Sequence, residues 1–455
     1  MKKELRKMIF VSLGFVMLSS LAACKTKTAP APANTTVSQS VPTAPTTEPE
    51  PHKLVAEEGA QVRFTYWAGS PSDEAAWKLI LDGFTKAHPE IKLEAEEMPS
   101  NTYATQLDTL VAGNDWPDVM RCTYQRLGKY KESGVLLDLT DIISKESIDD
   151  LVPAYRNALT YEGKLLGMPH HTDTVAVFYN KEMFEKSGIR IPTSTKDGWT
   201  WDELDSIAKK LKSDHDLENA FAGIWENNNG YRFLPFVYMN GGALLNDDGT
   251  KITADTPEFI NAIKLFESWR KDNLVTATGM TQPNQANSMF VAKKLAFVFA
   301  GSWHCSYMEE NFPGNWGVTY MPVVDGKTGS DMGGNGLFAY KGTKYPNASA
   351  IFIDYVTNAE NMQAFCEEGN FIPVRQSLID KGLTFVEFQD EMNIFLNIVS
   401  TIDPKMAQDE TSAKFQQLNL AFCQEMDPLV VNGSATAEEV VSNLQAKLQE
   451  ILDEQ

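Results

Sequence analysis

The chain has 455 residues, of which 43% are hydrophobic and 10% aromatic. This composition excludes a disordered protein, and the length predicts a core divided over two lobes. The formal net charge is -21. Nucleic acids and anionic membrane surfaces bind to clustered Lys and Arg, so we do not expect either as a partner.

The N-terminal residues have the pattern of an export signal. A basic segment over residues 2–7 precedes an apolar segment over residues 8–18, followed by Leu21-Ala22-Ala23-Cys24. The apolar segment is too short to span a bilayer of about 30 Å, which argues against an uncleaved membrane helix. The pattern resembles a bacterial lipobox, which implies a signal peptide over residues 1–23, cleavage before Cys24 and diacylation of its thiol. We expect the Pro- and Thr-rich residues 24–58 to form a disordered tether.

The first globular segment alternates predicted strands and helices. Residues 62–67 and 91–96 alternate apolar and polar side chains as strands do, and a helix over 72–87 with Ser72 as its cap separates them. A second helix over 103–112 leads to a third strand near residues 118–120. This order predicts a parallel sheet whose ligand crevice lies at the carboxyl ends of the strands.

Residues 161–204 continue the α/β pattern. Thr174–Tyr179 is almost uninterrupted in β-branched and aromatic residues, as a strand buried on both faces would be. Thr200 and Glu203 form a capping box at the start of a helix with an apolar stripe. A second capping box, Thr436 with Glu439, precedes another such helix near the C-terminus.

The same segment resembles a known family. It contains Tyr-x-Gly-Lys, Gly-x-Pro, Tyr-Asn-Lys-x-x-Phe-x-x-x-Gly-Ile and Trp-x-Glu-Leu, which together are similar to the hinge-crossing segment of the family 1 extracellular solute-binding proteins, the sugar-binding components of ABC importers. Similar blocks precede this segment at 110–119 and 134–140 and follow it, in order, at 239–249, 290–303, 346–357 and 369–375.

This resemblance implies a two-lobe, periplasmic-binding-protein-like α/β fold with hinge strands and a central ligand cleft. Lobe 1 would comprise residues 60–173 and 335–372, and lobe 2 residues 175–332 and 375–455. The Gly-rich residues 332–336 fit a second crossing, because glycine lets the backbone change direction with little strain.

A sugar site needs aromatic rings to stack on the C–H face and polar groups for the hydroxyls. Six aromatic residues fall on loops predicted to face the crevice: Trp67, Tyr103, Tyr124, Trp225, Tyr231 and Trp303. Ordinary packing is an equal alternative for any one of them, although Trp303 stands out because it follows Ala300-Gly301-Ser302 at a strand end. Helix patterns place Trp77, Trp201 and Trp269 in the core instead.

The polar candidates are Gln125, Arg126, Asp173, Glu226, Asn227, Asn335 and Arg375. The resemblance implies that Asp173 accepts hydrogen bonds from sugar hydroxyls. For Arg126 a surface position, and for Arg375 a role as a helix or loop anchor, are favoured over contact with ligand.

No pattern indicates catalysis, a metal or a cofactor. His170 and His171 are adjacent, and adjacent strand residues point to opposite faces, so they cannot share one metal ion without a bulge. The Gly-rich residues 333–336 lack the Lys-Ser/Thr of a phosphate loop. No Gly-x-Ser-x-Gly elbow is present.

Four cysteines remain besides Cys24, which allows three disulfide pairings in an exported protein. A bridge across a moving cleft would lock it, which leaves Cys122 with Cys366 and Cys305 with Cys423. We favour free, mostly buried thiols, since a chain of this size does not depend on disulfides.

We therefore expect a monomeric receptor, lipid-anchored at Cys24 on the extracytoplasmic face of the cell membrane. It would bind a mono- or oligosaccharide and deliver it to ABC transporter permease subunits. One alternative is the same fold binding an iron complex or a polyamine, which would call for clustered Tyr and His or an acidic cage. A second is an extracellular polysaccharide-processing enzyme, which would require two carboxylates at fixed separation.

Overall fold

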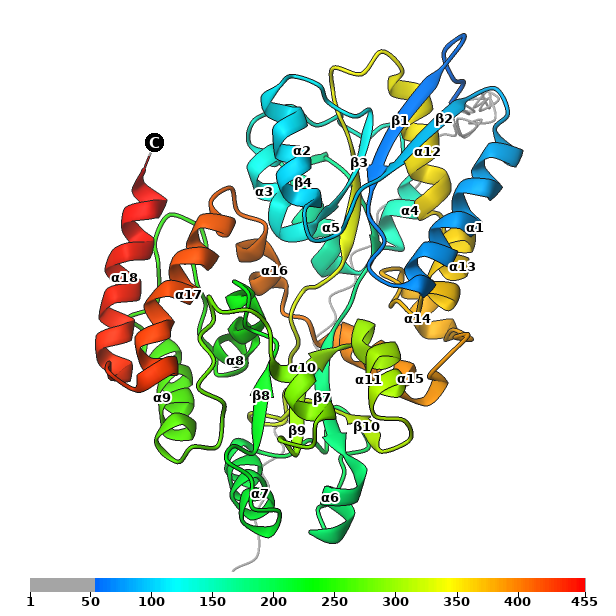
Figure 1. Cartoon of the computed structure of the whole chain (residues 1–455). Coiled ribbons are helices and arrows are strands. Elements are labelled where there is room, and N and C mark those ends of the chain that lie inside the picture. Colours follow the sequence, from blue (N-terminus) through cyan, green and yellow to red (C-terminus); the bar gives the residue numbers. More distant parts are fainter. Residues whose placement is uncertain (1–53, 455) are drawn as a thin grey trace, which may run out of the picture. The chain divides into compact units, whose positions relative to one another are not determined.

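The computed structural model describes residues 54–454. The predicted signal peptide, Cys24 and nearly all of the predicted tether lie outside the described residues. Two sheets organise the described chain (Figure 1). We call the five-stranded sheet with its helices lobe 1, and the four-stranded sheet with its helices lobe 2.

The sheet of lobe 1 has the strand order β2-β1-β3-β11-β6. Strands β1, β2 and β3 are parallel, as the alternation of strands and helices predicts, whereas β11 runs antiparallel to both of its neighbours. Its strands are β1 (Gln61–Tyr66), β2 (Lys92–Glu97), β3 (Val119–Thr123), β6 (Met168–His171) and β11 (Asn335–Ala339).

Helices cover both faces of this sheet. Figure 1 shows α1, α12 and α13 on one side and α2, α3 and α5 on the other. The cap of α1 differs from the prediction: Ser70, not Ser72, accepts the backbone N–H of Asp73 at 3.1 Å, because Pro71 already occupies the first helical position. The helices and the small hairpin strands are α1 (Pro71–Ala87), α2 (Tyr103–Ala112), α3 (Tyr124–Lys131), α4 (Lys145–Asp149), α5 (Pro153–Leu159), β4 (Thr160–Tyr161), β5 (Lys164–Leu165), α12 (Pro346–Thr357) and α13 (Ala359–Gly369).

The sheet of lobe 2 has the order β10-β7-β9-β8. Its central strands, β7 and β9, are buried except for the partly exposed Tyr179, which explains their nearly continuous apolar sequence. The strands are β7 (Val175–Asn180), β8 (Phe221–Gly223), β9 (Phe297–Gly301) and β10 (Trp316–Thr319).

The capping boxes predicted at Thr200 and Thr436 are present at the starts of α7 and α18. The remaining helices are α6 (Lys181–Lys186), α7 (Trp201–Asp214), α8 (Leu234–Met239), α9 (Pro257–Lys271), α10 (Ala286–Val291), α11 (Cys305–Asn311), α14 (Gln376–Lys381), α15 (Gln389–Ile398), α16 (Pro404–Glu410), α17 (Phe415–Asn432) and α18 (Ala437–Asp453), with short 3₁₀ turns η1 (Gly230–Phe233), η2 (Ser302–His304) and η3 (Val399–Thr401).

Connections between the two sheets lie side by side. The backbone N–H of Val175, at the start of β7, donates to Ser330 Oγ at 2.7 Å and to Asp331 Oδ1 at 3.1 Å. Thr172 forms an antiparallel bridge with Ile372. The first two connections between the sheets are therefore neighbours, and a third passage of the chain runs beside them.

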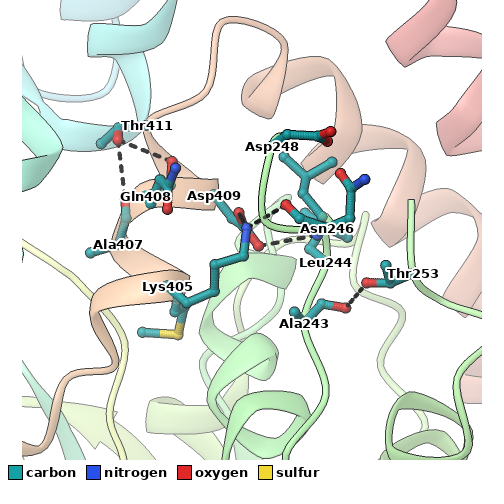
Figure 2. Close-up of polar contacts among 12 residues, drawn as sticks. Ala243, Leu244, Asn246, Asp248, Thr253, Lys405, Ala407, Gln408, Asp409 and Thr411 are labelled. Carbon is teal, nitrogen blue, oxygen red and sulfur yellow. Dashed lines mark hydrogen bonds and ion pairs between the residues drawn. The ribbon is translucent and has the colours of Figure 1, made fainter. Parts of the chain in front are cut away.

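Helix α16 contacts helices of both lobes. Asp409 is oriented to lobe 2, where its Oδ2 accepts the backbone N–H of Leu245 at 3.1 Å. It also pairs at 2.7 Å with Lys405 of the same helix, whose Nζ donates to the Asn246 carbonyl at 2.7 Å (Figure 2). The next residue, Glu410, is oriented to lobe 1, and its Oε2 accepts a hydrogen bond from Gln125 Nε2 at 2.9 Å. Two consecutive acidic residues thus attach this helix to different lobes.

The four described cysteines are free and buried, as we favoured from the sequence. Burial raises the pKa of the Cys122 thiol to about 12. Among residues 54–454, no helix is both long and apolar enough to cross a membrane.

Candidate functional site

A cavity of about 220 Å³ is bounded by residues of both lobes. It contains six of the residues singled out from the sequence: Trp67, Gln125, Asp173, Tyr231, Trp303 and Asn335. Volume alone does not distinguish this cavity, since hollows of about 550 Å³ and 530 Å³ also exist. Those hollows lie among lobe 2 elements only, whereas this one combines rings and buried charges from both lobes.

The lobe 1 wall is built around Trp67, which follows β1. The guanidinium of Arg121, from β3, lies 4.3 Å from the centroid of the Trp67 ring and donates to the Trp67 carbonyl. Its Nη1 is also 3.1 Å from Asp73 Oδ2, and both side chains are almost completely buried. Asp73 accepts the N–H of Gly69 as well, so the turn that carries Trp67 is fixed at two points.

The lobe 2 wall repeats this arrangement around Trp303, which follows β9. The guanidinium of Arg232 lies 4.3 Å from the Trp303 ring centroid and 4.8 Å from that of Tyr231. Its Nη1 pairs with Asp331, which is completely buried. A side chain at Gly301 would collide with the Trp303 ring, so this glycine lets the indole fold back over its own strand.

Asp173 lies between β6 and β7, where the chain first passes from lobe 1 to lobe 2. Its side chain is 14% exposed, and Oδ1 is 3.7 Å from Arg232 Nη1 without a hydrogen-bond partner. Burial raises its pKa to about 7, although Arg232 opposes the shift. A Cβ atom at Gly333 would collide with this carboxylate, so the absence of a side chain at this position of the second crossing leaves room for Asp173.

Two amides complete the polar lining. Gln125 Nε2 donates to the Met332 carbonyl at 2.7 Å in addition to Glu410. The Asn335 amide nitrogen is 3.2 Å from His171 Nε2, while its Oδ1 is buried without a partner. Burial lowers the pKa of His171 well below its usual value, so the neutral ring is the acceptor for this amide. The cavity therefore offers aromatic faces, amide groups and an unpaired carboxylate oxygen, a set suited to a polyhydroxylated ligand.

Three predicted aromatic contacts lie in the core instead. Trp225 is 2% exposed and packs among phenylalanines of lobe 2. Tyr124 is fully buried, and its hydroxyl donates to the His171 carbonyl at 2.8 Å. Tyr103 supports Trp67 from behind, with ring centroids 4.7 Å apart.

Two predicted polar contacts also lie elsewhere. Arg375 is 2% exposed and binds the carbonyls of Thr357 and Ser147, both at 2.9 Å, which is the anchoring role favoured from the sequence. Asn227 is exposed in a left-handed conformation, with its N–H bonded to the Gln282 carbonyl.

Glu226 and Arg126 also have structural partners. The Glu226 carboxylate accepts the backbone N–H groups of Gln285 and Ala286 at the start of α10. Arg126 pairs with Asp108 at 2.7 Å.

The two arginines of the cavity and their aspartate partners are not among the residues predicted from the sequence. Arg121 had a usable signal, because an arginine inside the apolar strand Val119–Cys122 requires a buried partner. For Arg232 the only signal in the sequence was its position beside Tyr231. Asp331 is 99 positions away from Arg232, and no local pattern connects them.

Within residues 54–454, no group of three or more His, Cys, Asp and Glu side chains is arranged to hold a metal ion.

Comparisons with known proteins agree with this geometry. The family model for bacterial extracellular solute-binding proteins matches residues 67–363. A maltodextrin-binding protein of Bacillus subtilis (strain 168) is 27% identical over 302 residues, which cover 64% of this chain and 68% of that protein. A multiple sugar-binding protein of Streptococcus mutans serotype c is 24% identical over 362 residues, which cover 74% of this chain and 82% of that protein.

Among solved structures, the GacH receptor of Streptomyces glaucescens GLA.O has a TM-score of 0.72 at 23% sequence identity. The match covers 87% of this chain and 99% of that chain. The likeness shows the two-lobe α/β fold.

Proposed function

Because this chain belongs to the bacterial extracellular solute-binding proteins, we propose that it is the receptor of an ABC importer, which captures a mono- or oligosaccharide and delivers it to permease subunits. The observation that carries the proposal is the cavity, to which each lobe contributes a tryptophan and the crossing between them contributes Asp173. The sugar-binding relatives in Bacillus and Streptococcus support the same ligand class.

Capture would work by closure of the lobes. A ligand that stacks on Trp67 and Trp303 contacts both lobes only when they are close, so its binding free energy favours the closed state. The cavity of about 220 Å³ is smaller than sites for drug-sized ligands. We therefore propose that one sugar unit is enclosed and that any further units extend towards solvent.

Titration calorimetry with neutral pentoses, hexoses and their oligosaccharides tests the ligand class, and X-ray scattering with and without the bound sugar tests closure. A smaller radius of gyration is expected at saturation. If no sugar binds and an iron complex or a polyamine does, the ligand of this receptor is that solute and not a sugar. Analysis of the sugar after prolonged incubation should recover it unchanged, whereas cleavage would favour the polysaccharide-processing alternative.

We also propose that the mature protein is a monomer attached to the extracytoplasmic face of the membrane through acylated Cys24. The basis is the sequence pattern of residues 2–24, with two acyl chains giving the stable attachment that one chain does not. Cys24→Ser should abolish lipid attachment and release the protein from membranes. A Cys24→Ser protein that is still lipidated and membrane-bound would contradict the proposal, and gel filtration with light scattering tests the monomer.

A further inference from the structure

Two arginines reach the cavity, one from each lobe, which at first suggests a site for an anion. Neither is free, however, because Arg121 pairs with Asp73 and Arg232 pairs with Asp331. In both pairs the carboxylate belongs to the protein and is almost completely buried. The positive charges that an acidic ligand would need are therefore already neutralised.

Asp331 cannot turn away from Arg232 without losing other bonds. Its Oδ1 accepts the N–H of Val175 at 3.1 Å and the hydroxyl of Ser330 at 3.2 Å, while Oδ2 pairs with the guanidinium. The side chain is fully buried and does not line the cavity. The carboxyl group of Asp331 is thus held in place beside Arg232, where burial raises its pKa and the Arg232 guanidinium opposes that rise.

Two further carboxyl groups lie near Arg232, and one of them, Asp173, lines the cavity. Asp173 Oδ1 is 3.7 Å from its Nη1, and the buried Glu410 is close enough for Arg232 to oppose the rise in its pKa. Around Arg232 the carboxyl groups therefore outnumber the single guanidinium. A ligand carboxylate or phosphate would enter a poorly solvated space in which both arginines are already paired with protein carboxylates, at a substantial electrostatic cost.

We infer that the site selects uncharged sugars over sugar acids and sugar phosphates, and that Asp331 determines this selectivity by neutralising Arg232. The inference rests on the proposed function, since it assumes that the ligand is a sugar. Asp331 does not touch the ligand and acts through the charge and position of Arg232.

The test is the ratio of the dissociation constants of a sugar acid and its neutral counterpart, measured by calorimetry at pH 8. Suitable pairs are glucuronate with glucose, galacturonate with galactose, and the corresponding oligosaccharides. Wild-type protein should bind the neutral member more tightly. Asp331→Asn makes the surroundings of Arg232 more positive by one charge, and the ratio should fall about tenfold or more in favour of the acid.

Asp409→Asn is the matched control. Asp409 is also a buried aspartate of lobe 2 that pairs with a cation, Lys405 at 2.7 Å, but it does not line or back the cavity (Figure 2). This variant should lose stability and leave the ratio unchanged. A purely structural role of Asp331 would make the two variants behave alike.

Circular dichroism establishes that each variant is folded. If Asp331→Asn does not fold, Asp73→Asn frees Arg121 in lobe 1 and should lower the ratio in the same way. A sugar acid that binds the wild type as tightly as its neutral counterpart, or an unchanged ratio in folded Asp331→Asn, would overturn the inference and leave sugar capture intact. If neither member of any pair binds the wild type, the proposed function fails, and the inference fails with it.

Discussion

Strands β8 and β9 each end at the glycine of a Gly-x-Trp sequence, and the two tryptophans should respond very differently to truncation. In Gly223-Ile224-Trp225 and Gly301-Ser302-Trp303, a side chain on the glycine would collide with the indole, so both rings fold back over their strands. Trp225 is 2% exposed within the lobe 2 core, whereas Trp303 is half-buried and lines the cavity. Replacing either tryptophan with alanine removes the same side chain, so a difference between the two variants distinguishes a packing role from ligand contact.

For Trp303→Ala, the lost stacking on a sugar is about 1–3 kcal/mol by analogy with base stacking, which weakens binding by about one to two decades. The folded variant also loses the partly exposed cation–π contact with Arg232, whose guanidinium lies 4.3 Å from the Trp303 ring centroid. This loss should lower the free energy of unfolding by about 0.5–2 kcal/mol. Trp225→Ala empties a core position and should cost about 3–5 kcal/mol of unfolding free energy. Calorimetry with the bound sugar and urea unfolding measure the two quantities.

If Trp303→Ala unfolds as readily as Trp225→Ala and yet binds its sugar with normal affinity, Trp303 is a core residue and the lobe 2 side of the site lies elsewhere.

Further predictions concern protonation, the second crossing and a buried anchor. Burial raises the pKa values of Asp173 and Glu226 to about 7, so each of these two groups binds more protons in the folded, ligand-free protein than in the unfolded chain between about pH 4 and pH 7, and each makes stability fall as pH rises through that window. Asp173→Asn removes one of these contributions, so over the same pH window the melting temperature of the variant should fall less, or rise more, than that of the wild type; an unaltered profile would contradict the assignment. Gly333→Ala should displace the Asp173 carboxylate and weaken sugar binding about tenfold in a protein that still folds, as calorimetry and circular dichroism can establish. Arg375→Met should lower the free energy of unfolding by about 2–4 kcal/mol and leave sugar affinity unchanged, because Arg375 binds only structural partners outside the cavity. If a stable Arg375→Met protein loses sugar affinity, Arg375 belongs to the binding site.

The parts of the fold that the sequence predicts are those set by local chemistry. The capping boxes at Thr200 and Thr436 consist of residues three positions apart, and the apolar run at residues 174–179 identifies β7 almost to the residue. Even the misplaced cap of α1 is a local matter, because Ser70 and Ser72 flank Pro71 and only the position of the proline distinguishes them.

The chain order also predicts where the site lies, but not which side chains enter it. Trp303 and Trp225 occupy the same place in the same local pattern, and whether a ring faces the cavity depends on the helices that pack against it. The same limit applies to Arg232. Its position is set by Asp331, which is remote in sequence and lies beside β7 only after folding.

The antiparallel strand β11 has a consequence for how lobe 1 folds. It lies between β3 and β6, and its Asn335 is adjacent to His171, 164 positions earlier in the chain. Until residues 335–339 have been synthesised, β3 and β6 lack the strand that joins them, and each presents an unpaired edge. Such long-range pairing slows folding and leaves partly folded chains open to association. A chain ending before residue 335 is therefore not a smaller version of this protein, because the sheet of lobe 1 would be divided through its interior.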